Sequence, residues 1–508
     1  MMITHKWTRT VVGGAAVILT AACSTDLEIT NPNNPDIERA LRTPEDVRNI
    51  AISTINSWYL ASTYIEPYLM LSVTADALTA NFGNFGMRFN NLQPRIPYGN
   101  SSAGGDRLVT EEPWEQNYST IGAANDVLRA IRVGNVSLGN ADSTAKYEHL
   151  AMFARAASLM NIALIFDRGF VVNEAFKPGI DPNPELQPYE EVADTALKWF
   201  EELAAATSGK SYAYAASVLP LSERPPATSP GNLSSSKLHR MANTMAALLL
   251  AYTPRRAADV AGVDWAKVRT LADKGIGTGS AGAPFNVVVD GDGGTNWFSY
   301  INYYGNEPSW TRVDMRLINR MDPSQPAVFT GTIAPAGSSP DARYTGDYER
   351  CPCDATSAVI GDPGRGIYMQ SYFSHKRYRD HSRTTSGGAP DTPVPYLLAA
   401  ESDLVLAEAL IRSGGDKNLA ATLINKTRVT RGTLTAATGG ESNEALLGYI
   451  DYERDVELLN TNGFDHFRRR HVDGLQAGTL RHLPIPAKEL ETLQLPIYTF
   501  GGVGLPDM

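Results

Sequence analysis

The side chains best suited to ligand chemistry are aromatic and amide residues between positions 296 and 310. This stretch reads NWFSYINYYGNEPSW and sets six rings among three asparagines. An aromatic face buries the C–H surface of a sugar ring or an extended peptide, while amides hydrogen-bond hydroxyl or backbone groups. The alternative is that the rings pack as a satellite of the core. The residues predicted to bind ligand here are Trp297, Tyr300, Tyr303, Tyr304 and Trp310.

A shorter upstream stretch has the same composition. Residues 79–91 read TANFGNFGMRFNN, from which Asn81, Phe82 and Phe85 are also predicted to bind ligand. Both stretches fall in segments without sustained periodicity, at about 81–113 and 277–395. Long irregular segments held on a rigid scaffold are commonly functional, so the ligand-binding region is placed at about 277–395.

Motifs that carry catalysis or bind cofactors are absent from the sequence. It contains no GxSxG, HExxH, P-loop or paired GxGxxG. Asp290 and Asp292 begin like a calcium loop, but the twelfth position is Ile301 where a bidentate glutamate is required. No catalytic residue and no cofactor are predicted. Two carboxylates that meet only in space could still hydrolyse a glycan, so a hydrolase stays an alternative.

Cysteine chemistry is limited to three residues. Cys351 and Cys353 stand in RCPCDA, with only His375 and His381 nearby. Two thiols do not complete a four-ligand zinc site, so no metal is predicted. The pair forms either a local disulfide or two free thiols.

The N-terminus has the pattern of an export signal. Lys6 and Arg9 precede an apolar run at 11–22 that is too short to span a bilayer, and Cys23 follows two alanines. The site resembles a bacterial lipobox, so residues 1–22 are predicted to be a lipoprotein signal peptide and Cys23 the lipid anchor. The alternative is an ordinary signal peptide with a chance cysteine. No linker-like composition divides residues 23–508, which are predicted to form a single domain.

Apolar residues recur at helical spacing along much of the chain. The segments that show this are 121–131, 150–164, 192–203, 241–252, 265–271 and 397–411, and Asp416 is placed to cap a further helix through 424. These segments are rich in alanine, which lets neighbouring helices approach closely. The prediction is a mostly α fold of tetratricopeptide-like helical hairpins with long irregular loop insertions.

Six segments together resemble a known family. In order they are PWEQNYSTIGAANDVLRAI (113–131), AMFARAASLMNIALIFDRGFVV (151–172), AESDLVLAEALIRSGG (400–415), LINKTRVTRG (423–432), YERDVELLNTNGFDHFRRRHVDGL (452–475) and LPIPAKEL (483–490). They resemble the landmarks of SusD/RagB-type outer-membrane nutrient-uptake lipoproteins. Met152 and the QLPIYTFGG tail depart from the family's pattern.

The resemblance implies a SusD-like fold and a lipid-anchored protein on the outer surface of the outer membrane. It implies a non-enzymatic function: capture of glycan or peptide oligomers and their delivery to a SusC-like TonB-dependent transporter. Docking on that barrel is predicted for helices at 43–60, 114–132 and 148–166. The alternatives are a surface hydrolase of the same polymers and a helical-repeat envelope scaffold.

Charge bears on the partners. The 508 residues include 45 Lys and Arg against 55 Asp and Glu, a net charge of −10, which argues against nucleic acid and favours neutral ligands. The basic C-terminal segment is predicted to be structural instead. Glu453, Arg454 and Glu457 at helical spacing, with Arg468 to Arg470 nearby, are predicted to form a partly buried ion-pair network.

Overall fold

The computed structural model describes most of the chain after position 40. The described residues are 41, 43–81, 83–177, 180–215, 217–222, 233–290, 296–308, 310–330, 337–350, 371–379 and 393–505. The predicted signal peptide, Cys23, Phe82 and the pair Cys351 and Cys353 lie outside them.

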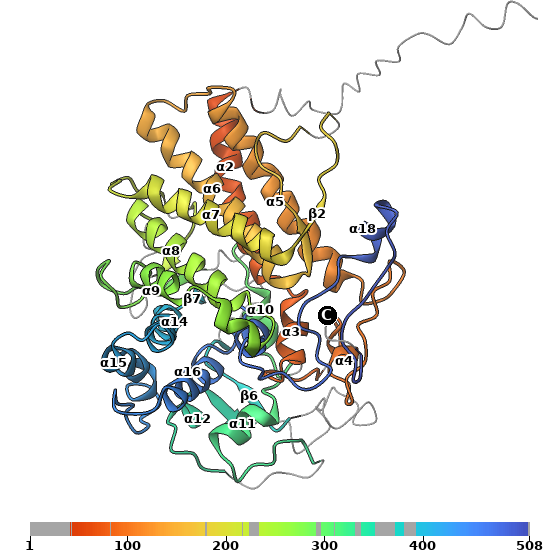
Figure 1. Cartoon of the computed structure of the whole chain (residues 1–508), viewed down its shortest axis with the longest axis vertical. Coiled ribbons are helices and arrows are strands. Elements are labelled where there is room, and N and C mark those ends of the chain that lie inside the picture. Colours follow the sequence, from red (N-terminus) through yellow and green to blue (C-terminus); the bar gives the residue numbers. More distant parts are fainter. Residues whose placement is uncertain are drawn as a thin grey trace, which may run out of the picture.

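A continuous array of helices forms the scaffold (Figure 1). Each helix packs on the next scaffold helix in the chain, and α9 packs on α14, which continues the array after the insertion. The scaffold helices are α2 (Pro44–Thr63), α5 (Leu108–Arg132), α6 (Ala141–Ile165), α7 (Tyr189–Thr207), α8 (Ser235–Tyr252), α9 (Trp265–Asp273), α14 (Ala399–Arg412), α15 (Lys417–Arg428) and α16 (Asn443–Glu457). The mostly α, SusD-like helical fold predicted from the sequence is confirmed.

Local sequence explains where these helices begin and how closely they pack. Asn140 and Ser234 cap α6 and α8, and Asp416 caps α15 as predicted, each by accepting a hydrogen bond from a first-turn backbone N–H. Helix α6 is buried on every side from residue 149 to residue 165. Its alanines permit this, because small side chains let α2, α5 and α7 all approach it. None of the described helices is long and apolar enough to cross a membrane.

The insertion at 277–395 contains more regular structure than the sequence predicted. Its described parts hold α10 (Tyr300–Gly305), α11 (Met315–Met321), α12 (Arg343–Gly346), β4 (Val287–Val289), β5 (Tyr348–Arg350), β6 (Phe373–His375) and β7 (Val394–Leu397). Strands β4 and β7 form an antiparallel sheet with β3 (Leu221–Ser222), and β5 pairs with β6. Elements this short leave no sustained periodicity in the sequence.

Two apolar clusters connect the insertion to the scaffold. The main core runs through the scaffold helices and includes Trp297 and Ile301. A second core forms where α3 (Tyr68–Thr74) meets α11, β6 and the end of α16, with Leu69, Ile318 and Val456 among its buried residues. The insertion therefore packs on both cores. Ile301 lies in the main core and Tyr304 packs against the second core, and these contacts fix the position of α10.

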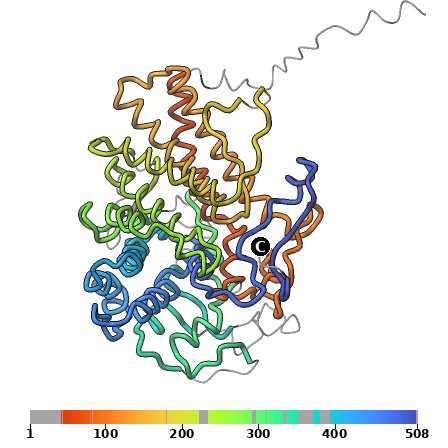
Figure 2. The backbone as a smooth tube through the Cα atoms, viewed as in Figure 1, coloured from red at the N-terminus to blue at the C-terminus, as the bar shows by residue number. Residues whose placement is uncertain are grey.

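The C-terminal segment closes the fold. After α17 (Asp465–Arg470) and α18 (Ala487–Thr492) the chain runs beside residues 95–100, where the Tyr98 amide donates to the Phe500 carbonyl at 3.0 Å (Figure 2). The β1 (Arg168–Phe170) and β2 (Leu186–Pro188) hairpin lies between α6 and α7 in the chain.

The prediction of a partly buried ion-pair network is confirmed only in part: Glu453, Arg454, Glu457 and Arg468 are buried and ion-paired, but with partners on other elements and not with one another. Arg468 pairs with Glu401 at 2.9 Å, Arg454 with Glu408 at 2.7 Å, and Arg343 with Glu453 at 2.7 Å. All six side chains are at most 2% exposed. The basic C-terminal segment is therefore part of the interior, where it joins α16 and α17 to α12 and α14.

Candidate ligand-binding site

The structure brings the two predicted ligand-binding stretches together. Phe85 stacks on Trp310 with ring centroids 5.6 Å apart, and Tyr304 contacts Phe85 at 5.5 Å and Trp310 at 4.5 Å. Phe85 and Trp310 are more than two hundred positions apart in the chain. Their contact means that both stretches contribute to one surface.

Three further tyrosines extend this surface toward the scaffold. Tyr303 contacts Tyr304 at 4.9 Å, Tyr300 lies parallel to Tyr304 at 6.4 Å, and Tyr64 meets Tyr300 edge-on at 5.0 Å. All six rings are half-buried. We call this set the aromatic cluster: Tyr64, Phe85, Tyr300, Tyr303, Tyr304 and Trp310.

A single short helix positions the centre of the cluster. Ser299 caps α10 by accepting a hydrogen bond from the Asn302 amide at 3.3 Å. Tyr300, Tyr303 and Tyr304 then stand at positions i, i+3 and i+4, which fall on one face of a helix. The stretch was expected to be a loop, but helical geometry is what aligns its tyrosines.

Asn81, Asn302 and Asn306 are buried, and their side chains hold the backbone of the two stretches. Asn81 donates to the Pro308 carbonyl at 3.1 Å, and Asn306 donates to the Asn302 carbonyl at 2.8 Å. Asn306 also hydrogen-bonds His375 at 2.7 Å. Asn81 is 1% exposed, so in this structure its side chain joins the two stretches and does not face solvent.

Trp297 also lies inside the protein. It is 7% exposed, belongs to the main core and contacts Tyr59 of α2 with ring centroids 5.5 Å apart. Phe298 is equally buried and supports Tyr300 at 4.5 Å. These two rings act as packing beneath the cluster. Ligand binding by the half-buried rings, Phe85, Tyr300, Tyr303, Tyr304 and Trp310, stays a prediction.

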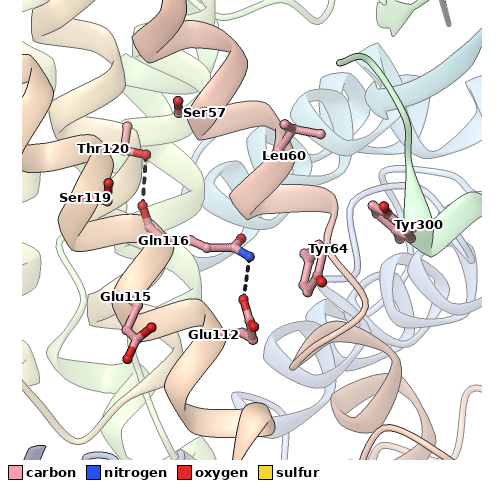
Figure 3. Close-up of a pocket in the computed structure, with 9 residues that line it drawn as sticks. All are labelled: Ser57, Leu60, Tyr64, Glu112, Glu115, Gln116, Ser119, Thr120 and Tyr300. Atoms are coloured by element: carbon pink, nitrogen blue, oxygen red, sulfur yellow. Dashed lines mark hydrogen bonds between the residues drawn. The ribbon is translucent and has the colours of Figure 1, made fainter. Parts of the chain in front are cut away.

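A cavity of about 600 Å³ opens between α2 and α5 beside the cluster (Figure 3). Tyr64 and Tyr300 belong to both, so cavity and cluster form one continuous site. We call it the α2–α5 cavity, and its lining residues are Ser57, Leu60, Tyr64, Glu112, Glu115, Gln116, Ser119, Thr120 and Tyr300. Gln116 donates to the Glu112 carboxylate at 2.7 Å, and the Thr120 hydroxyl donates to the Gln116 carbonyl at 2.9 Å. A volume of this size is typical of a small-molecule site.

The electrostatics of the α2–α5 cavity are acidic. Among the described residues its lining holds two carboxylates, Glu112 and Glu115, and no lysine, arginine or histidine, while Lys488 outside the lining pairs with Glu115 at 2.9 Å. Close by, burial and the negative charge of Glu112 raise the pKa of Glu66 to about 7. Burial, with Glu112 and Glu66, also raises the pKa of Tyr64. The site suits neutral, hydroxyl-rich ligands and disfavours anionic ones.

Sequence reasoning missed Tyr64 and the cavity. Tyr64 lies directly after α2, between Thr63 and Ile65, and nothing in this local sequence separates it from core tyrosines. Glu112, Glu115 and Gln116 look like ordinary surface positions of a long helix. The packing of α2 against α5 brings Glu112 and Gln116 to one space, while Glu115 lies at its edge, 59% exposed and paired with Lys488 at 2.9 Å. Among the described residues, no group of three or more His, Cys, Asp or Glu side chains is arranged to hold a metal ion.

Comparisons with known proteins place the fold. No protein-family model matches the sequence, and no curated protein matches it in a sequence search. Solved structures match across most of the chain. A SusD homologue from Bacteroides thetaiotaomicron superimposes with a TM-score of 0.58 at 15% identity, covering 89% of this chain and 97% of its own.

Two more solved structures are of carbohydrate-binding proteins. Surface glycan-binding protein A from Bacteroides thetaiotaomicron, in complex with laminarihexaose, has a TM-score of 0.59 at 12% identity and covers 90% of this chain and 99% of its own. A SusD-like carbohydrate-binding protein from Bacteroides fragilis has a TM-score of 0.58 at 14% identity, covering 84% and 86%. The chain therefore has the SusD-like fold over most of its length.

Proposed function

We propose that this protein binds glycan oligomers at the site formed by the aromatic cluster and the α2–α5 cavity, and that it does so without chemistry. The observation that carries the proposal is the continuous row of six half-buried rings ending in a polar cavity of about 600 Å³. Proteins with the same fold include a surface glycan-binding protein solved with laminarihexaose, which supports the same ligand class here.

The chemistry of the site favours glycans over peptides. Successive ring faces match the apolar faces of successive sugar units, and the cavity wall supplies hydroxyl, amide and carboxylate groups for sugar hydroxyls. The charged side chains of the lining are Glu112 and Glu115, which would repel the negative charge of uronate or sulfate groups. Neutral oligosaccharides are therefore the proposed ligands.

Binding and turnover by the purified protein test this proposal. Tyr300, which belongs to both cluster and cavity, is expected to contribute about 1–3 kcal/mol, so Tyr300→Ala should weaken binding of the best neutral oligosaccharide by that amount. Titration calorimetry over a panel of glucan, mannan and xylan oligomers and peptides measures it. Tyr147→Ala, a half-buried tyrosine in α6, is the matched control and should leave affinity unchanged.

Three results would contradict the proposal. Release of new reducing ends during incubation would favour the surface hydrolase, with Glu66, Glu112 and Glu115 as the first carboxylates to substitute. Saturable binding of peptides alone, unaffected by Tyr300→Ala, would place the ligand elsewhere. Failure to bind any member of either panel would favour the envelope scaffold.

We further propose that the protein is held on the outer surface of the outer membrane by acylated Cys23 and delivers its ligand to a SusC-like TonB-dependent transporter. The lipobox-like sequence before Cys23 supports the anchor. The SusD-like fold supports the partner by analogy only. Helices α2 and α5 overlap the segments predicted to dock and also line the cavity, so docking there would bring the ligand close to the barrel.

Affinity purification from solubilised native membranes is expected to recover a stoichiometric TonB-dependent barrel. Cys23→Ala should release the protein from the membrane or stall its processing. Repeated recovery of the protein alone, under conditions that preserve other envelope complexes, would remove the support for a transporter partner. Unchanged membrane retention of the Cys23→Ala variant would refute the lipid anchor.

A further inference from the structure

A second cavity lies between the β1–β2 hairpin and the C-terminal segment, and it has no lining residue in common with the α2–α5 cavity. Its volume is about 740 Å³, and most of its wall is apolar. We call it the C-terminal cavity. The aliphatic side chains that line it are Leu186, Ile485, Leu490, Leu495 and Leu505.

Four rings stand around this cavity. His482 and Phe500 meet edge-on at 4.3 Å, Tyr498 and Phe500 at 5.5 Å, and Tyr189 and His482 lie 6.1 Å apart. All four line the cavity. The faces of aromatic rings carry partial negative charge and attract cations, so a ring-lined cavity suits a positively charged group.

One carboxylate faces the same space. Asp167 accepts a hydrogen bond from the Tyr498 hydroxyl, at 2.8 and 2.9 Å from its two oxygens. In the described part of the chain, no lysine or arginine forms an ion pair with it. Arg255 is close enough to influence it, but its guanidinium donates to the carbonyls of Leu164 and Phe166. A carboxylate accepts about four hydrogen bonds, so Asp167 retains capacity for a ligand donor.

The state of this carboxylate at neutral pH follows from its surroundings. Burial raises the pKa of Asp167 to about 6, while the Tyr498 hydrogen bond and the charges of Arg168 and Arg255 oppose the rise. Asp167 is therefore mostly ionised at pH 7.5. The other charged side chains of the lining, Arg168 and Glu190, are exposed and of opposite sign. An anionic group at one end of an apolar, ring-lined cavity is what an amphipathic cation requires.

We infer that the C-terminal cavity binds an apolar molecule carrying an amine. The ammonium group donates to Asp167 beside the Tyr498 ring, since Arg255 already lies over the Tyr189 ring, 4.0 Å from its centroid. The apolar body lies against Leu490 and Leu505. This site is independent of the proposed glycan site. The two cavities have different lining residues, and their proposed ligands are an apolar amine here and a neutral oligosaccharide there.

Three probes with one skeleton test the inference: 4-phenylbutylamine, 4-phenylbutanol and 4-phenylbutyrate at pH 7.5, with calorimetry on the full soluble protein. The amine is expected to bind about tenfold or more tightly than the alcohol, because only the amine forms a charge-assisted hydrogen bond. The carboxylate should bind least. Asp167→Asn should bring the amine to the level of the alcohol while leaving the alcohol unchanged, since an amide oxygen still accepts from Tyr498.

A second variant keeps the test decisive if Asp167→Asn fails to fold. Leu505 is 53% exposed and lines the cavity, so Leu505→Lys places a positive charge at its mouth without disturbing packing. It should weaken the amine and strengthen the carboxylate, and Leu505→Gln is the matched control. Equal affinities for amine and alcohol, or no binding of the amine at millimolar concentration, would overturn the inference.

Discussion

Replacing Arg468 by alanine is expected to lower the free energy of unfolding by about 3–5 kcal/mol, because it leaves buried carboxylates without their counter-charge. Arg468 is 2% exposed. It donates to Glu401 at 2.9 and 3.0 Å, to Asp465 at 3.1 Å and to the Asn462 side chain at 2.6 Å. These contacts join α17 to α14, so their loss loosens the whole C-terminal segment.

Chemical denaturation measures this effect, with Lys267→Ala as the control. Lys267 pairs with Glu201 at 2.8 Å, but the two side chains are 36% and 41% exposed. A surface pair of this kind contributes about 0–1 kcal/mol. Equal losses for the two variants would show that burial does not set the strength of the Arg468 network. A stable Arg468→Ala protein would return these arginines to candidates for function.

Half of this network was visible in the sequence. Glu453, Arg454 and Glu457 lie at helical spacing, and the nearby Arg468 completes a plausible set. Their strongest partners could not be predicted. Arg454 pairs with Glu408 and Arg468 with Glu401, both on α14, and such pairs between separate elements leave no pattern in spacing.

The same division between local and non-local information holds for the fold. Most scaffold helices, α5 to α9 together with α14 and α15, were predicted because apolar residues recur in them at helical spacing and Asp416 supplies a cap. The order in which they pack follows the chain, so hairpin packing was also predictable. The strands of the insertion could not be predicted, because β4 and β6 are three residues long and their pairing is set by tertiary contacts.

For the site, composition identified the residues but not their arrangement. The rings of 297–310 and the ring of Phe85 were singled out because so many aromatics in apparent loops are unusual. Their joining into one cluster depends on Asn81 reaching the Pro308 carbonyl, a contact across two hundred positions. Burial was equally hidden, because no sequence signal shows that Trp297 is buried in the main core while Trp310 is only half-buried.

The difference in burial between Trp297 and Trp310 leads to the second prediction with a large effect on stability. Trp297→Ala is expected to lower the free energy of unfolding by about 3–5 kcal/mol, as for other large-to-small substitutions in a core. Trp297 is 7% exposed and packs on Tyr59 in the main core. The fraction that stays folded should bind the best oligosaccharide with unchanged affinity, because this side chain lies beneath the cluster and not on its surface.

Trp310→Ala should show the reverse pattern. Trp310 is half-buried and stacks on Phe85 at the surface of the cluster, so its removal should cost about 1–3 kcal/mol in ligand binding and no more than about 1 kcal/mol in stability. Denaturation and calorimetry on both variants separate the two roles. A loss of affinity in Trp297→Ala without loss of stability would mean that this ring becomes exposed when ligand binds. A loss of stability in Trp310→Ala with full affinity would reduce the aromatic cluster to packing and leave the α2–α5 cavity to bind ligand alone.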